Sequence, residues 1–250
     1  MKRMFKMLVA VMAMVMVLGV AAANAEGMLE RVKEAGVVTV GNSPDYPPYE
    51  NMDGDKRVGF DIDLMEAIAD KMGIKIEWRT MGFDTIISAV TMGQVDLGCS
   101  GFGITEDRKR SVDFTDPYYR SGQVIVTRKG ADIKAGKDLA GKRVAAQLGT
   151  TCVEAARKVD GAEVVEPETW SVAFMMLKTE AVDAVVADIP VAEEYAKKQG
   201  FVIAPEPLTE ELNAIIVPKG NPEMVKALNA ALAELREDGT HAKLVEKWMK

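Results

Sequence analysis

The 250-residue sequence is poor in the residues on which metal sites, disulfide scaffolds and nucleic-acid recognition depend. It has one histidine and two cysteines, which gives no support to a His/Cys metal centre or to histidine-based catalysis. A chain this long needs no disulfide to bury a core, so we expect Cys99 and Cys152 to be buried free thiols. The 31 basic residues are outnumbered by 38 acidic ones and form no cluster with aromatics, which argues against nucleic acid. The composition therefore favours a small molecule or another protein as partner, with no metal and no cofactor.

Only one hydrophobic run approaches the length of a membrane span, and it lies at the N-terminus. Lys2, Arg3 and Lys6 precede an apolar segment over residues 7–23, and a small-residue motif, Ala-Asn-Ala, ends at Ala25. This pattern is typical of a secretory signal peptide cleaved after Ala25. A membrane anchor is the alternative, but the run lacks a basic stop-transfer flank. We therefore expect residues 1–25 to be a signal peptide that exports the protein to the periplasm.

The first half of the remaining chain alternates between β-rich and amphipathic segments. Leu64, Ile68 and Met72 recur at helical spacing, Asp61 is placed to cap the start of their helix, and Gly73 is placed to end it. The same pattern predicts strands over 37–40, 74–78 and 95–99 and helices over 64–72 and 83–92. The order is β-α-β-α-β.

A second unit of the same kind follows a polar and aromatic segment over 117–122. It has predicted strands at 124–127, 144–148, 164–166 and 184–187, helices at 151–158, 171–178 and 191–198, and a later strand at 214–217. A final helix opens at Asn221-Pro222, where proline occupies a favoured first position. Two such units predict an α/β fold with two mostly parallel sheets, which bind ligands beyond the carboxyl ends of their strands.

Arg108 lies at an electrostatically unfavourable position in the segment CSGFGITEDRKR. Thr105 predicts a helix N-cap, after which acidic residues suit the positive end of the helix and a cation does not. A surface salt bridge with Asp107 or Asp113 is the simple explanation. An anionic ligand is the other.

Six segments, in this order and spacing, resemble one family. They are PPYE, MGFDTIISAV, GFGITEDRKRSVDFTDPYY, LAGKRVAAQLGTT, VDAVVADIPVAEEY and DGTHAKLVEKW, and GFDIDLMEAIADKMG looks like its signature segment. The sequence thus resembles the periplasmic amino-acid-binding proteins of ABC importers, the bacterial extracellular solute-binding proteins of family 3. The resemblance implies a monomeric receptor that delivers an amino acid to a membrane permease and its ATPase.

The same resemblance implies the type II periplasmic-binding-protein fold, in which two α/β lobes are joined by two hinge strands and close over the ligand. The crossings are expected near Tyr118–Gly122 and Asn213–Val217. Lobe 1 would comprise residues 26–119 and 216–250, and lobe 2 residues 120–215.

Site residues carry over from the family by position. Arg108 would pair with the ligand's α-carboxylate in the bidentate geometry that a guanidinium suits. Gly101 would offer backbone contacts, Thr151 would add an N–H and a hydroxyl to the carboxylate, and Asp188 would hold the α-ammonium. Without the family, Asp188 is explained as a helix cap before Pro190.

The ligand side chain would lie between Tyr46 and Phe83, with Gln147 touching it from lobe 2. As packing residues instead, Tyr46 would cover a sheet edge and Phe83 would be an ordinary helix-start contact. Two positions depart from the family pattern. Gly103 stands where Ser or Thr is usual, which removes a hydroxyl contact, and Ser43 stands where many receptors for basic amino acids have aspartate.

These departures favour a neutral polar amino acid, because the implied side-chain pocket has no fixed charge. A basic amino acid (arginine, lysine or histidine) is the alternative, for which Asp45, Glu50 or Asp84 would have to turn into the pocket. A dehydratase on the same fold is a further alternative and needs a general acid, for which Glu106 and Glu168 are the candidates. A sensor domain is disfavoured by the lack of a signalling segment.

Overall fold

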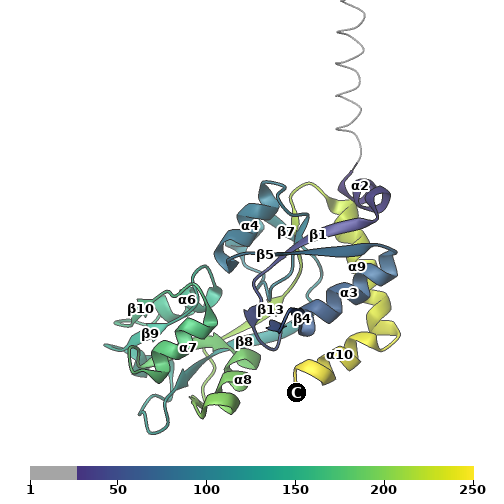
Figure 1. The fold of residues 1–250 in the computed structure, drawn as a ribbon. Coiled ribbons are helices and arrows are strands. Elements are labelled where there is room, and N and C mark those ends of the chain that lie inside the picture. The colour runs from purple at the N-terminus through teal and green to yellow at the C-terminus, as the bar shows by residue number, and fades with distance from the viewer. Residues whose placement is uncertain (1–26) are drawn as a thin grey trace, which may run out of the picture.

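The computed structural model describes residues 27–250 as two lobes connected by a pair of long strands (Figure 1). The predicted signal peptide and its cleavage site lie outside the described residues. Within 27–250, each helix is too short or too polar to cross a membrane.

The sheet of the first lobe has the strand order β5-β1-β6-β14-β7. These strands are β1 (Val37–Asn42), β5 (Lys75–Thr80), β6 (Leu97–Gly98), β7 (Val112–Phe114) and β14 (Ile216–Pro218). Strand β1 runs parallel to β5 and β6, whereas β14 is antiparallel to β6 and β7. The sheet is therefore mostly parallel, as predicted, and its one reversed strand returns the C-terminal segment to this lobe.

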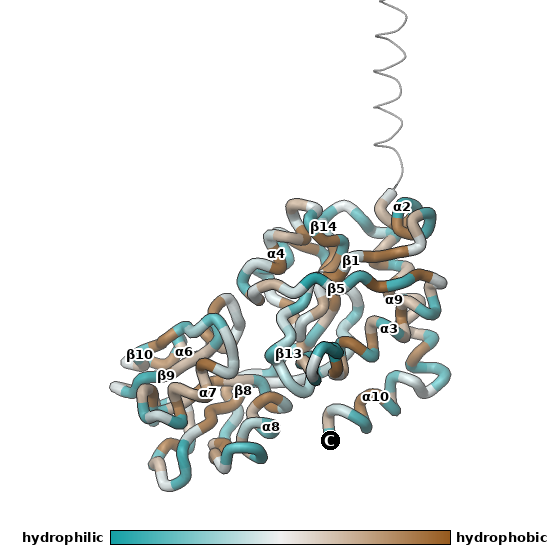
Figure 2. Tube along the Cα trace, in the orientation of Figure 1, coloured by the Kyte–Doolittle hydropathy of each residue, from teal (hydrophilic) through white to brown (hydrophobic). Residues whose placement is uncertain are grey.

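Helices cover both faces of this sheet with separate apolar clusters. Helix α4 (Phe83–Thr91) packs on one face, α2 (Met28–Ala35), α3 (Phe60–Met72) and α9 (Pro222–Glu237) pack on the other, and α10 (Thr240–Trp248) packs against α3 and α9. Strands β1 and β14 of this sheet include strongly hydrophobic segments, whereas the edge strand β5 is largely hydrophilic (Figure 2).

The predicted apolar stripe and end of helix α3 are confirmed, but its predicted cap is wrong. Leu64 and Ile68 are buried, and Gly73 ends the helix in the left-handed conformation. The N-cap residue is Gly59 rather than Asp61. The Asp61 carboxylate instead accepts hydrogen bonds from distant parts of the lobe, because it lies buried beneath the loops that form the cleft.

The second lobe has a sheet with the order β10-β9-β11-β8-β12. These strands are β8 (Tyr119–Thr127), β9 (Arg143–Ala145), β10 (Glu163–Val165), β11 (Ala184–Asp188) and β12 (Val202–Ile203), and a 3-10 turn, η1 (Gly136–Leu139), follows β8. Helices α6 (Thr151–Arg157), α7 (Trp170–Lys178) and α8 (Ile189–Gln199) pack against the sheet. Phe174 and Tyr195 stack with ring centroids 3.8 Å apart, which ties α7 to α8.

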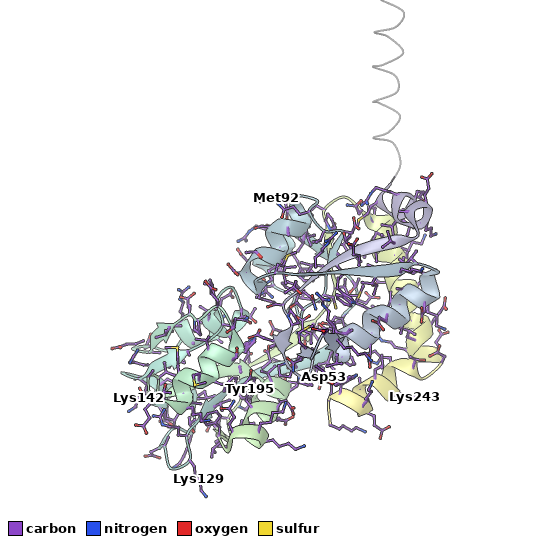
Figure 3. All side chains as sticks on the ribbon, viewed as in Figure 1. Asp53, Met92, Lys129, Lys142, Tyr195 and Lys243 are labelled. Atoms are coloured by element: carbon purple, nitrogen blue, oxygen red, sulfur yellow. The ribbon has the colours of Figure 1, made fainter. Side chains whose placement is uncertain are left out.

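The two connecting strands run side by side. Strand β8 pairs with β13 (Thr209–Asn213) in antiparallel register, with Tyr119 opposite Asn213 and Gln123 opposite Thr209. These are the two hinge strands that the family resemblance predicts. We propose lobe boundaries at 119/120 and 215/216, because the pairing moves from one sheet to the other there. Figure 3 places Met92 and Lys129 at outer edges of the two lobes, away from this connection.

A small antiparallel sheet, not predicted from the sequence, lies beside the hinge in the first lobe. It comprises β2 (Asp45–Tyr46), β3 (Glu50–Asp53) and β4 (Lys56–Val58). This sheet positions Tyr46 and Glu50, both of which contribute to the site described next.

Candidate ligand-binding site

One pocket between the lobes is lined by every site residue predicted from the sequence except Gly103. Its lining residues are Ser43, Tyr46, Phe83, Ser100, Gly101, Arg108, Gln147, Thr150, Thr151 and Asp188. Ser100 and Thr150 are additions that the sequence did not predict. Gly103 lies directly behind the pocket, where its carbonyl oxygen accepts a hydrogen bond from Arg108 Nη1 at 2.9 Å.

Arg108 is carried into the pocket by the short helix α5 (Glu106–Lys109). The Thr105 side chain accepts a hydrogen bond from the Arg108 backbone N–H at 3.1 Å, so the predicted N-cap is confirmed. The side chain is only 8% exposed, and its Nη2 donates to the Gly149 carbonyl of the second lobe at 3.1 Å. Arg108 therefore spans the cleft.

The surface salt bridge considered for Arg108 is not formed. Asp107 pairs with Arg110, and Asp113 pairs with Lys219. The buried guanidinium is left facing the pocket with neutral carbonyl partners.

Two phenylalanine rings pack against the Arg108 guanidinium. The Phe83 and Phe102 rings stack with centroids 4.8 Å apart, and Arg108 Cζ lies 5.5 Å from the first centroid and 5.4 Å from the second. Burial lowers the pKa of Arg108, while nearby acidic groups, Glu211 first among them, oppose this shift. The rings hold a cation in place without neutralising it.

Asp188 supplies the opposite charge from the second lobe, at the end of β11. It is buried, and its side chain forms no cap hydrogen bond to α8, so the helix-cap explanation does not hold. Among the hydrogen bonds of residues 27–250, its carboxylate accepts only one, from Cys152 Sγ at 3.8 Å. Burial and the charge of Glu211 raise the pKa of Asp188. A cation entering the pocket would find this carboxylate with most of its hydrogen-bonding capacity free.

Two buried carboxylates lie beneath the first-lobe wall of the pocket. Glu50 accepts hydrogen bonds from the Ser43 N–H at 3.1 Å and from the Ser100 hydroxyl. Asp61 accepts from the Gly101 N–H at 2.7 Å and from the Tyr118 hydroxyl at 3.0 Å. The two side chains thus fix the loops that follow β1 and β6.

Burial raises the pKa of Glu50 to about 8, with a further contribution from neighbouring Asp61. Burial likewise raises the pKa of Asp61 to about 7. For a basic ligand, the sequence makes Glu50 one of three carboxylates that would have to turn into the pocket. The structure instead places it below the loops, because β3 directs its side chain toward Ser43 and Ser100.

An aromatic wall closes one side of the pocket. Tyr46 stacks on Tyr49 with centroids 4.8 Å apart and on Trp170 of the second lobe at 5.6 Å. Gly101 has a φ of +60°, and a Cβ there would lie 2.5 Å from the Tyr46 ring. Glycine at this position therefore satisfies both the backbone conformation and the close approach of the ring.

The predicted second-lobe residues Gln147 and Thr151 lie opposite this wall. Gln147 Nε2 donates to the Glu168 carbonyl at 2.9 Å, and the Thr150 hydroxyl donates to the Gln147 carbonyl at 2.6 Å. Thr151 begins helix α6, and its Oγ1 accepts from Gln123 Nε2 at 2.8 Å. The second-lobe wall is thus built from the loop between β9 and α6.

A second, open cavity continues from Ser43 and is rich in carboxylates. Asp45, Asp84 and Glu168 line it, together with Ser43, Pro44, Thr80, Met81, Gly82 and Thr169. Burial raises the pKa of Asp45 to about 6. Glu106, by contrast, has a side chain that is 85% exposed and pairs with Lys109 outside the cleft.

Glu211, which the sequence did not predict, lies beside the pocket on hinge strand β13. Gln123 Nε2 donates to its carboxylate at 3.2 Å, and the side chain also contacts Thr151. Glu211 belongs to a polar stretch without a motif, so no local pattern marks it. The unusual Gly103, whose space it occupies, is the one signal that points to it.

Comparison with known proteins decides the family. Residues 38–250 match the family model described as bacterial extracellular solute-binding proteins, family 3. The chain belongs to this family.

The arginine-binding extracellular protein ArtP of Bacillus subtilis (strain 168) is 38% identical over 216 residues, which is 84% of each chain. The L-cystine-binding protein TcyJ of Escherichia coli (strain K12) is 31% identical over 249 residues, covering 96% of this chain and 94% of TcyJ. Among solved structures, the ancestral amino acid-binding protein AncCDT-1, a precursor of cyclohexadienyl dehydratase, superposes with a TM-score of 0.85 at 38% identity, covering 89% of this chain and 99% of that one. The type II periplasmic-binding-protein fold of this solute-binding protein follows from such likenesses.

Proposed function

We propose that this solute-binding protein captures a polar α-amino acid between its lobes and delivers it to an ABC permease with its ATPase. The observation that carries the proposal is the pair of opposite charges that face one pocket. Arg108 offers a buried cation to the α-carboxylate, and Asp188 offers a buried carboxylate to the α-ammonium. Because the two residues come from different lobes, a ligand that engages both favours the closed arrangement.

For the side chain of the ligand, we propose a positive charge. The sequence alone favours a neutral ligand side chain, because Ser43 stands where many receptors for basic amino acids have aspartate. The cavity that continues from Ser43 carries Asp45, Asp84 and Glu168, so carboxylates reach the side-chain end by another route. An arginine-binding relative supports this choice, although a cystine-binding relative shows that the family accepts neutral side chains as well.

A thermal-shift panel of the twenty amino acids tests the proposal. L-arginine or L-lysine is expected to raise the melting temperature most, because a long cationic side chain reaches the acidic cavity. Asp84→Asn should reduce the shift from L-arginine, whereas Asp53→Asn, at the exposed end of β3, should leave it unchanged. A larger shift from L-glutamine than from both basic amino acids would overturn the cationic side chain but not the receptor. No shift from any amino acid would overturn the receptor.

Membership of the family implies an exported protein. We propose cleavage after Ala25 and a monomeric mature receptor. Mass spectrometry of the secreted protein should give the mass of a chain that begins at Glu26. A retained N-terminal segment would contradict the proposed cleavage.

An enzyme of the dehydratase type is the second candidate, and the position of Glu168 is the observation that favours it. Glu168 lines the acidic cavity, whereas the other acid considered, Glu106, points to solvent. We favour a receptor over an enzyme, because the charges of Arg108 and Asp188 are complementary to the α-carboxylate and the α-ammonium of an unmodified amino acid. Incubation of the protein with a hydroxylated cyclic carboxylic acid that can lose water should return the acid unchanged, and a dehydrated product would favour the enzyme.

A further inference from the structure

Gly103 and Glu211 occupy one space between the ligand pocket and the hinge. Gly103 forms an isolated antiparallel bridge with Asn213, which places Glu211, two residues earlier on β13, on the same side. A Cβ on Gly103 would lie 1.6 Å from Glu211 Oε1 and 2.2 Å from its Cδ. The φ of Gly103 lies outside the left-handed region, so a larger residue here would meet the Glu211 side chain rather than backbone strain. The carboxyl group of Glu211 therefore occupies the volume that a side chain at 103 would fill.

This carboxyl group lines a groove that adjoins the ligand pocket and shares Thr151 with it. The Gly103 carbonyl beside it accepts from Arg108, and the group itself contacts Thr151 and accepts from Gln123. Arg108 and Thr151 are the residues proposed to hold the α-carboxylate of the ligand. Glu211 thus lies next to both of them.

The charges around Glu211 make two carboxylates at this end unfavourable. Arg108 is the one cationic side chain among the residues that line the pocket. The other titratable groups that face Glu211 or line the groove beside it are Asp188 from β11, Cys152 and Glu154 from α6, Lys158 just after α6, Arg120 from β8 and Glu210 from β13. Arg120 is paired with Glu210 at 3.1 Å. A single guanidinium would have to balance both Glu211 and the ligand's α-carboxylate if Glu211 stayed ionised.

We propose that Glu211 is a ligand-binding residue that replaces the side chain absent at Gly103 and contacts the α-carboxylate as a neutral acid, so that binding takes up one proton at Glu211. The inference rests on the proposed amino-acid receptor. A neutral carboxyl donates its O–H to the ligand carboxylate, which is the role a hydroxyl at 103 would have, whereas an ionised one repels it. The proton comes from solvent.

The electrostatic environment agrees with this geometry. Burial raises the pKa of Glu211, the charge of Glu154 adds to the shift, and Arg108 opposes it. An incoming α-carboxylate competes for Arg108 and raises the pKa of Glu211 further. Affinity should therefore fall as pH rises through the interval between the free and bound pKa values, by at most about tenfold per pH unit for one linked proton.

Calorimetric titration with L-arginine at pH 5.5, 7.0 and 8.5 tests the proposal in Glu211→Gln, which keeps a neutral donor at every pH. Because Asp188 also titrates near the ligand, the informative quantity is the ratio of the wild-type Kd to the variant Kd. This ratio should rise at least threefold between pH 5.5 and 8.5. The matched control, Glu210→Gln, changes the neighbouring exposed carboxylate, and its ratio should stay constant. A ratio for Glu211→Gln that changes less than threefold overturns the proposal.

A second pair of variants tests whether Glu211 replaces the missing side chain. Glu211→Ala leaves neither a carboxyl nor a hydroxyl at this point and should bind L-arginine at least tenfold more weakly at pH 5.5. Adding Gly103→Ser to Glu211→Ala restores a hydroxyl in the vacated space and should recover at least threefold of the affinity. No recovery, with both variants melting as cooperatively as the wild type, overturns the replacement.

These experiments separate failure of the inference from failure of the proposed function. Since Glu211 faces the head group of the ligand, L-glutamine and L-cystine can replace L-arginine in every titration. If any of the three binds and the ratio of the wild-type Kd to the Glu211→Gln Kd stays constant with pH, only the role of Glu211 is overturned. Absence of binding by all three overturns the amino-acid receptor and the inference with it.

Discussion

The two walls of the cleft treat their buried carboxylates in opposite ways. Below the first-lobe wall, Glu50 and Asp61 accept hydrogen bonds from backbone N–H groups and hydroxyls of their own lobe. At the second-lobe wall, Asp188 accepts only from a thiol, as far as residues 27–250 show, and Glu211 accepts from the neutral amide of Gln123. The first pair holds the loops of its own lobe in place, whereas Asp188 lines the pocket and Glu211 lines the groove that adjoins it.

This difference assigns separate tasks to the lobes. The first lobe presents a wall whose loops and Arg108 are held by internal contacts before a ligand arrives, which is the preorganisation that favours binding. The second lobe presents the Asp188 carboxylate, which is costly to bury in its ionised form without a cation. A ligand ammonium reduces that cost only when the lobes close, so the second wall couples binding to closure.

Removing the fixed cation of the first wall should have the largest effect. Arg108→Ala leaves the α-carboxylate without its charged partner, and loss of one member of a desolvated pair costs about 2–5 kcal/mol. We expect the affinity for L-arginine in calorimetry to fall by about thirtyfold or more. Arg110→Ala, at an exposed arginine two residues along the chain, is the matched control and should bind normally. A loss below threefold for Arg108→Ala would refute the carboxylate role.

Changing the unpaired carboxylate of the second wall should have the next largest effect, and a selective one. Asp188→Asn keeps the shape of the side chain but removes the charge that faces the α-ammonium. The affinity for L-arginine is expected to fall by about tenfold or more, because a charged hydrogen bond is replaced by a neutral one. The affinity for 5-guanidinopentanoic acid, which lacks the α-amino group, should change less than threefold. Equal losses for both compounds would show that Asp188 does not contact the ammonium.

Much of this architecture could be predicted from local patterns. Alternating β-rich and amphipathic segments predicted the two α/β units, and a cation misplaced at a helix start singled out Arg108. Glycine at the end of α3 and threonine at the start of α5 acted as their residue types predict. The two cysteines are buried and unbonded, as expected for a fold with sufficient apolar core. Such features depend on residues close together in the sequence.

The missed residues depend on contacts between distant segments. Asp61 has the sequence context of a helix cap, and only the approach of Gly101 and Tyr118 shows its actual use. Glu211 lies 108 positions from Gly103 along the chain, so the space they share becomes visible only in the folded protein. The positive charge proposed for the ligand side chain likewise depends on distant segments, because Asp45 and Glu168 line one cavity from different lobes.

The buried carboxylates below the first-lobe wall predict a change in stability with pH rather than a change in affinity. The pKa of Glu50 is raised by burial to about 8 in the folded protein, above its ordinary value of 4.5. Between these values the folded chain holds more protons than the unfolded chain, so the free energy of unfolding falls as pH rises from about 5 to about 8. One such group contributes a slope of at most about 1.4 kcal/mol per pH unit.

Glu50→Gln removes this titration while an amide keeps the shape of the side chain and one acceptor for the Ser43 N–H and the Ser100 hydroxyl. Urea unfolding at pH 5.0, 7.0 and 8.5 should show a shallower loss of stability in the variant than in the wild type. Some slope should remain, because burial also raises the pKa of Asp61, to about 7. Glu66→Gln, at an exposed position of α3, is the control and should keep the wild-type slope. If Glu50→Gln also keeps the wild-type slope, Glu50 does not release a proton when the protein unfolds. The pH dependence of stability then gives no evidence for a separate role of the carboxylates below the first-lobe wall.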